Sequence, residues 1–70
     1  MTDKLQISLA AARVNANLTQ EDVARAMHLS KNTIVNWEKG KSEPSVSQSR
    51  ELEKLYNISM DYLFLPPTSN

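Results

Sequence analysis

Residues 19–40, TQEDVARAMHLSKNTIVNWEKG, constrain the fold of this chain more than any other segment. Thr19 and Ser30 each stand directly before a run of helix-forming residues. Hydroxyl side chains in this position cap a helix by accepting a hydrogen bond from a backbone N–H of its first turn. Gly40 follows the second run, where a left-handed residue commonly ends a helix. The segment therefore predicts two short helices joined by a tight turn.

The rest of the chain continues in short segments with apolar residues at spacings of three and four, as in amphipathic helices. A single glycine and almost no alternating pattern in 70 residues favour an all-α fold over one with strands. This length allows one domain with a small core. We expect a compact five-helix bundle with helices over residues 4–16, 20–27, 31–39, 47–56 and 60–65.

Composition argues against several classes of function. The chain has no cysteine, and its lone histidine, His28, has no second histidine to share a metal ion with. No acid–base pair, nucleophile–base pair or phosphate-binding loop is recognisable. We therefore expect neither an enzyme nor a bound metal or cofactor. No apolar run is long enough for a membrane span and the N-terminus lacks a signal-peptide pattern, so we expect a cytoplasmic protein with no membrane partner.

Polar side chains crowd the first turns of the helix expected over residues 31–39, while Ile34 and Trp37 have the spacing of core residues. Amide, hydroxyl and ammonium groups are those that read base edges in a major groove. The zero net charge of the chain counts against DNA binding. However, three lysines against one glutamate give residues 31–41 a net charge of +2, whereas four acidic against two basic residues give residues 42–70 a net charge of −2. The positive end of the chain therefore coincides with the candidate reading helix.

This layout resembles the phage-repressor helix-turn-helix family, also described as Cro/CI-type or XRE. The resemblance rests on the segments LTQEDVARAMHLSKNTIVNWEKGKSEPS and LEKLYNISMDYLF, and it covers about residues 5–65. It implies a lambda-repressor-like DNA-binding domain over residues 1–65. Residues 66–70 then form a polar tail or the start of a linker to a further domain.

The resemblance also implies roles for single residues. The base-facing positions of the family are matched by Ser30, Lys31, Asn32, Thr33 and Asn36. Its phosphate-contacting positions are matched by Gln20, Lys39 and Lys41. Arg13 and Glu38 match a partly buried ion pair that ties the first helix to the third in related repressors.

His28 departs from the family pattern, which usually has glycine at this position of the turn. The turn requires a positive φ, which glycine adopts without steric cost. Histidine tolerates positive φ better than most residues. We therefore expect the turn to form with a penalty of roughly 1 kcal/mol relative to glycine.

Two apolar surfaces are candidates for contact with a second subunit or another protein. The first is a stripe on the expected first helix, opposite its core face, that comprises Ile7, Ala10, Ala11 and Val14. Incidental exposure of small residues explains this stripe equally well. The rival surface lies at the C-terminal end, where subunits of the family commonly pair on DNA, and comprises Tyr62, Phe64 and Leu65. We prefer this end for a dimer bound to DNA.

Together these features predict a sequence-specific DNA-binding transcriptional regulator, most like a phage or prophage repressor. It would bind double-stranded DNA as a homodimer, with the helix over residues 31–39 in the major groove of each half of an inverted repeat. Such a dimer places its two reading helices about 34 Å apart. The alternative is an antitoxin-like or protein-interaction module whose main partner is a protein regulator, which the neutral charge and the first apolar stripe support.

Overall fold

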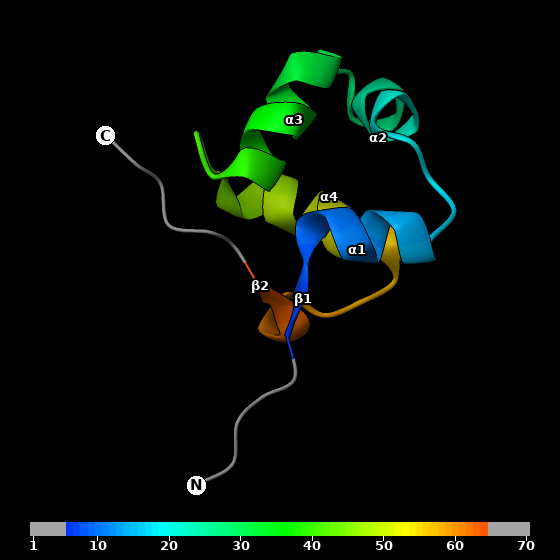
Figure 1. Cartoon of the computed structure of the whole chain (residues 1–70), viewed down its shortest axis with the longest axis vertical. Coiled ribbons are helices and arrows are strands. Elements are labelled where there is room, and N and C mark those ends of the chain that lie inside the picture. Colours follow the sequence, from blue (N-terminus) through cyan, green and yellow to red (C-terminus); the bar gives the residue numbers. More distant parts are fainter. Residues whose placement is uncertain (1–5, 65–70) are drawn as a thin grey trace, which may run out of the picture.

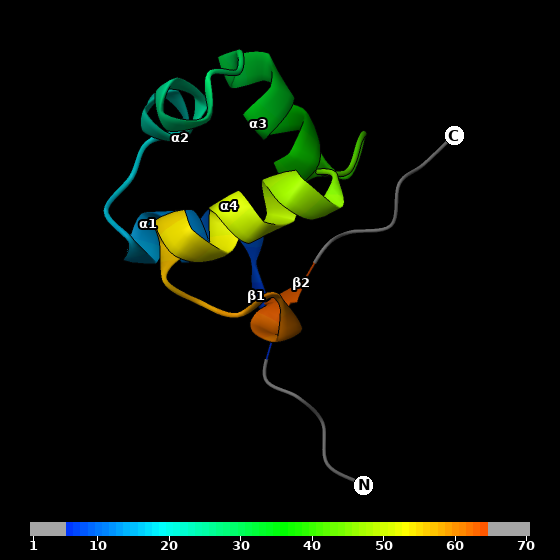
Figure 2. The ribbon, with the colours of Figure 1, turned by 180° about the vertical axis from the view of Figure 1, so that it is seen from behind.

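The computed structural model describes residues 6–64 of the chain. Within this range lie four α-helices, α1 (Leu9–Asn15), α2 (Gln20–Met27), α3 (Lys31–Lys39) and α4 (Val46–Tyr56). A 3-10 turn, η1 (Met60–Tyr62), and two short strands, β1 (Ile7–Ser8) and β2 (Leu63–Phe64), complete this part of the chain. Figure 1 shows α2 and α3 together at one end and the strand pair at the other, with α1 and α4 between them. From behind, α4 lies in front of α1 (Figure 2), and the two helices are in contact.

Local capping explains why α2 and α3 begin where the sequence predicts. The hydroxyl of Thr19 accepts from the backbone N–H of Asp22 at 3.0 Å, and the Asp22 carboxylate accepts from the N–H of Thr19 at 2.9 Å. Ser30 caps α3 by accepting from the N–H of Thr33 at 3.3 Å. Gly40 ends α3 with a φ of 77°. Both helices therefore have the predicted bounds, because their end signals are local.

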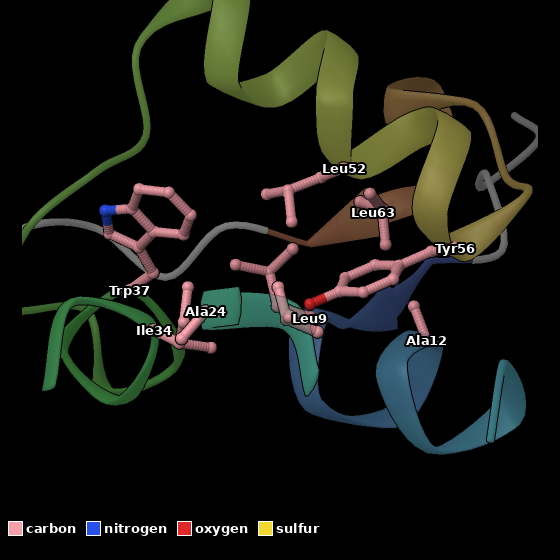
Figure 3. Close-up of a cluster of buried hydrophobic side chains, with 9 residues drawn as sticks. Leu9, Ala12, Ala24, Ile34, Trp37, Leu52, Tyr56 and Leu63 are labelled. Atoms are coloured by element: carbon pink, nitrogen blue, oxygen red, sulfur yellow. The ribbon is translucent and has the colours of Figure 1, made fainter. Parts of the chain in front are cut away.

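The core is one cluster of buried apolar side chains from all four helices and β2. Figure 3 shows these side chains converging on a common centre. Trp37 is only 3% exposed, which confirms that it is a core residue. Among the described residues the cluster comprises Leu9, Ala12, Val23, Ala24, Ile34, Trp37, Leu52, Tyr56 and Leu63.

The predicted first helix over residues 4–16 is wrong at its N-terminal end. Ser8 caps α1 by accepting from the N–H of Ala11 at 3.0 Å, so the helix begins at Leu9. Before it, β1 pairs in parallel with β2, with Ile7 opposite Leu63. Ile7 therefore lies on a strand, and the four-residue apolar stripe is not a continuous helical face. Residues 1–5, which include the start of the expected first helix, lie outside the described residues.

The predicted fifth helix over residues 60–65 is a single 3-10 turn. Ser59 caps it through a hydrogen bond from the N–H of Asp61 at 3.1 Å. The chain then turns extended at Leu63, whose side chain is buried in the core. Pairing of β2 with β1 takes up the residues that would have continued the helix. The described fold is thus mainly helical with four α-helices instead of five, and residues 65–70, including the expected tail, lie outside it.

Candidate nucleic-acid interface

The turn between α2 and α3 is formed by His28, Leu29 and Ser30. His28 adopts the left-handed conformation, with a φ of 58° and a ψ of 43°. The N–H of Leu29 donates to the carbonyl of Ala24 at 2.8 Å and so closes the end of α2. The positive φ expected at this position is confirmed, although histidine carries a Cβ atom that glycine would lack. This turn sets the direction in which α3 leaves α2.

The two sides of α3 have opposite character. Ile34 and Trp37 face the core, whereas Lys31 and Asn32 are exposed in the first turn. Asn36 lies one turn beyond Asn32 on the same side of the helix and is half-buried. The exposed side of α3 therefore presents an ammonium group and two amides in a short stretch.

Two of the expected base-reading residues also serve the local fold. The hydroxyls of Ser30 and Thr33 lie 3.1 Å apart, and Ser30 caps the helix.

Lys39 and Lys41, the lysines expected to contact phosphate, are both exposed around the C-terminal end of α3. The N–H of Lys41 donates to the carbonyl of Asn36 at 2.9 Å, which holds the segment after Gly40 against the last turn of the helix.

A single carboxylate, that of Glu38, holds three helices together. Arg13 on α1 donates to it from Nε at 2.8 Å and from Nη2 at 3.4 Å. Gln20 on α2 donates to it from Nε2 at 2.9 Å. The Arg13 and Glu38 side chains are only 15% and 8% exposed, so the pair is largely withdrawn from water. Because Glu38 itself belongs to α3, these bonds determine how α3 sits on α1 and α2.

The guanidinium of Arg13 has a further fixed partner, the carbonyl of Leu18, which accepts from Nη1 at 3.0 Å. The hydrogen bond to Glu38 raises the pKa of Arg13 above its usual value and outweighs the opposing effect of burial. Burial also raises the pKa of Tyr56 to about 12, and the negative charge of Glu38 adds to this effect. The Tyr56 phenol therefore stays neutral at neutral pH beside the charged guanidinium of Arg13.

Sequence reasoning missed an acidic residue beside the candidate reading helix. Glu21, the second residue of α2, places its Oε2 atom 3.1 Å from Nζ of Lys31. The pKa of Glu21 lies below its usual value, first because of a hydrogen bond from its own backbone and second because of Lys31. The two residues are ten positions apart on different helices, so no helical spacing in the sequence reveals the pair.

The residues expected to contact a partner protein are scattered. Val14 and Tyr62 are 60% and 49% exposed, whereas Ile7 is half-buried and packs against the core. The side chain of Phe64 and all of Leu65 lie outside the part that the structure describes. Val46, at the start of α4, is 74% exposed and was not anticipated from the sequence.

Other kinds of site have little support in residues 6–64. No group of three His, Cys, Asp or Glu side chains in this range is placed to hold a metal ion. None of the helices there has the length and apolarity needed to cross a membrane. The exposed side of α3 and the start of α2 combine polar and basic groups on a framework fixed by the Glu38 hydrogen bonds.

Comparison with known proteins shows that the sequence is similar to those of helix-turn-helix regulators. The family model described as helix-turn-helix matches residues 9–63. The chain is 37% identical over 49 residues to an uncharacterised HTH-type transcriptional regulator of Methanocaldococcus jannaschii, which covers 70% of this chain and 74% of the relative. It is 34% identical to the HTH-type transcriptional regulator ImmR of Bacillus subtilis and 33% identical to the HTH-type transcriptional activator BcrR of Enterococcus faecalis, each over 55 residues.

The matched segments cover 79% of this chain but only 43% of ImmR and 27% of BcrR. Its similarity to these two bacterial proteins is therefore confined to less than half of their length. No solved structure matches the chain significantly.

Proposed function

We propose that this chain, which belongs to the XRE-type helix-turn-helix family, regulates transcription by binding double-stranded DNA with α3 in the major groove. The observation that carries the proposal is the two-sided character of α3. Its inner side is fixed by Ile34, Trp37 and the Glu38 hydrogen bonds, and its outer side carries polar groups suited to base edges. A rigid element that presents such groups is what direct readout of a sequence requires.

Base contacts are assigned to the outer side of α3. In this proposal Lys31 donates to a guanine, and Asn32 or Asn36 pairs with an adenine through two hydrogen bonds. Ser30 and Thr33 stand at the start of the helix, where their hydroxyls can contact either a base or the backbone.

Phosphate contacts are assigned to the two ends of this surface. Gln20 stands in the first turn of α2, where backbone N–H groups and the helix dipole favour an anion. Its Nε2 atom already donates one hydrogen to Glu38, and the amide carries a second. Lys39 and Lys41 flank the other end of α3 and would contact the backbone by charge.

The proposed regulator acts as a repressor that binds an inverted repeat as a homodimer. Occupation of an operator can block polymerase by itself, whereas activation needs a further contact. A two-fold dimer would place two α3 helices in successive major grooves about 34 Å apart. We assign the subunit contact to the C-terminal end at Tyr62, Phe64 and Leu65, because Tyr62 is half exposed there.

Selection of bound sequences from a random duplex pool at about physiological salt tests this proposal. Enrichment of an inverted repeat is expected, and absence of any enriched sequence with folded protein would contradict it. Of the variants Asn32→Ala and Asn36→Ala, the one that removes the adenine contact should lose about 1–3 kcal/mol of discrimination at one base position. Asn15→Ala, on the exposed end of α1, is a matched control that should leave the selected sequence unchanged.

The phosphate assignments are tested separately from the base assignments. Lys39→Met should weaken binding to all duplexes alike and reduce the slope of log affinity against log salt by about 1. A change in the preferred sequence with an unchanged salt slope would instead place Lys39 at a base.

A second candidate function is a protein-interaction or antitoxin-like module. It is favoured by the 60% exposure of Val14 and the 74% exposure of Val46, together with the zero net charge of the chain. This function predicts tight binding to a protein partner that varies little with salt and is lost in Val14→Glu or Val46→Glu. DNA binding that falls steeply with salt and survives both substitutions would favour the regulator.

A further inference from the structure

The first two residues of α2 reach opposite ends of α3. Gln20 donates to Glu38, one residue before the last residue of α3, at 2.9 Å. Glu21 contacts Lys31, the first residue of α3, at 3.1 Å. The hydrogen bond between Gln20 and Glu38 is largely buried, because the Glu38 side chain is only 8% exposed. The Glu21 and Lys31 side chains, in contrast, are 56% and 53% exposed. The two contacts therefore differ in kind, since one is part of the framework and the other is open to solvent.

Lys31, the first residue of α3, is a basic residue on the outer side of this helix. In the free protein its ammonium already has an anionic partner in the carboxylate of Glu21. Exposed ion pairs are weak and are screened by salt, so a stronger anion can displace the carboxylate. A DNA duplex presents many such anions, together with the acceptor atoms of guanine.

We propose that Glu21 competes with DNA for the ammonium of Lys31 and thereby lowers the affinity of the α3 surface for DNA. The inference rests on the proposed DNA-binding function. When the protein binds a duplex, Lys31 must leave Glu21, and the carboxylate stays beside the phosphates that contact the first turn of α2. Glu21 therefore weakens binding both by holding Lys31 and by repelling the DNA backbone.

The competition has a measurable effect on salt dependence. Each phosphate that a lysine neutralises contributes about −0.9 to the slope of log affinity against log salt. Glu21→Gln leaves the positive charge of Lys31 unopposed, which is equivalent to about one more neutralised phosphate, so the slope should become steeper by about 1. We expect Glu21→Gln to bind the selected duplex about three- to tenfold more tightly at 50 mM salt, and this gain should shrink about threefold by 200 mM salt.

Two controls separate the local contact from the change in net charge. Glu51→Gln removes the same charge from an exposed position on α4 and should change affinity less than twofold. In a Lys31→Met background, Glu21→Gln should give a smaller gain than in the wild type, because only the repulsion between the carboxylate and the DNA backbone is then removed. Binding is measured by fluorescence anisotropy on the selected duplex, with folding of each variant checked by circular dichroism.

The outcomes distinguish this inference from the function on which it rests. If the wild-type chain binds no duplex, the proposed function and the inference both fail. If the wild-type chain binds but Glu21→Gln gives no gain in affinity, the inference alone fails. It also fails if Glu51→Gln, or Glu21→Gln in the Lys31→Met background, gives the same gain as Glu21→Gln in the wild type.

A carboxylate NMR titration of the free protein gives an independent check. The pKa of Glu21 should rise in Lys31→Met, and an unchanged value would show that the pair does not form.

Discussion

Arg13→Met tests whether the Glu38 carboxylate is the tie between α1, α2 and α3. The substitution keeps an apolar stem of similar reach and removes both guanidinium hydrogen bonds to Glu38. Glu38 then retains only the bond from Gln20, although its side chain is 8% exposed. A largely buried carboxylate without a cation is strongly unfavourable, so the folded state should lose stability.

The size of the expected loss of stability follows from the burial of the Arg13–Glu38 pair. Removing one partner of a buried ion pair typically costs about 3–5 kcal/mol. Glu38 keeps the hydrogen bond from Gln20 and some contact with water, so we expect a smaller loss of stability of about 2–3 kcal/mol. A chain of this size has a total stability of roughly 4–10 kcal/mol. The loss should therefore lower Tm by about 10–20 °C.

The assay is urea unfolding at neutral pH, followed by the fluorescence of Trp37. This residue is the only tryptophan in the chain and is buried, so its emission reports global unfolding. The informative comparison is the double variant Arg13→Met/Glu38→Met, which removes the uncompensated charge as well. Replacement of a buried ion pair by apolar side chains is often nearly neutral, so the double variant should lie within about 1 kcal/mol of the wild type.

Two results would refute this reasoning. A loss below about 1 kcal/mol in Arg13→Met would show that water replaces the guanidinium at little cost. A double variant that is less stable than the single one would show that Arg13 and Glu38 contribute through packing and not through a paired charge. Recovery of stability in the double variant is therefore the outcome that the structure predicts.

Three further predictions concern single residues. Because burial raises the pKa of Tyr56 to about 12, the unfolded chain loses this proton at lower pH than the folded chain. Stability should therefore fall by about 1–2 kcal/mol between about pH 10 and 12 after allowance for solvent screening, and Tyr56→Phe should abolish the fall in urea titrations at alkaline pH. His28→Gly should raise stability by about 0.5–1 kcal/mol because glycine adopts the φ of 58° without a Cβ clash, and an unchanged Tm would argue against strain. Ser45→Ala removes the acceptor for the N–H of Gln48 at 3.1 Å and should cost about 1 kcal/mol in thermal unfolding; no loss would mean that water caps α4 equally well.

The sequence by itself determined the features that depend on local interactions. The caps at Thr19 and Ser30 and the left-handed ends at His28 and Gly40 involve residues within a few positions of one another. Their hydrogen bonds are made within one turn, so the residue types alone specify where α2 and α3 begin and end. The spacing of Ile34 and Trp37 likewise identified the inner side of α3.

The Glu38 cluster could be predicted only in part. Arg13 and Glu38 are 25 positions apart, and only the resemblance to a repressor family suggested that they pair. The amide of Gln20 was expected at a phosphate, and its hydrogen bond to Glu38 emerged from the tertiary structure. No spacing rule connects residues on three different helices.

Tertiary structure alone decided the two ends of the domain and the charge environment of α3. The strand pair joins Ile7 to Leu63, so the helices expected over residues 4–16 and 60–65 were shortened by a partner far away in the chain. The contact of Glu21 with Lys31 depends on the angle at which α3 leaves the His28 turn. Local hydrogen bonds are specified by neighbouring residues, whereas these pairings depend on how the core brings distant segments together, which the sequence pattern does not express.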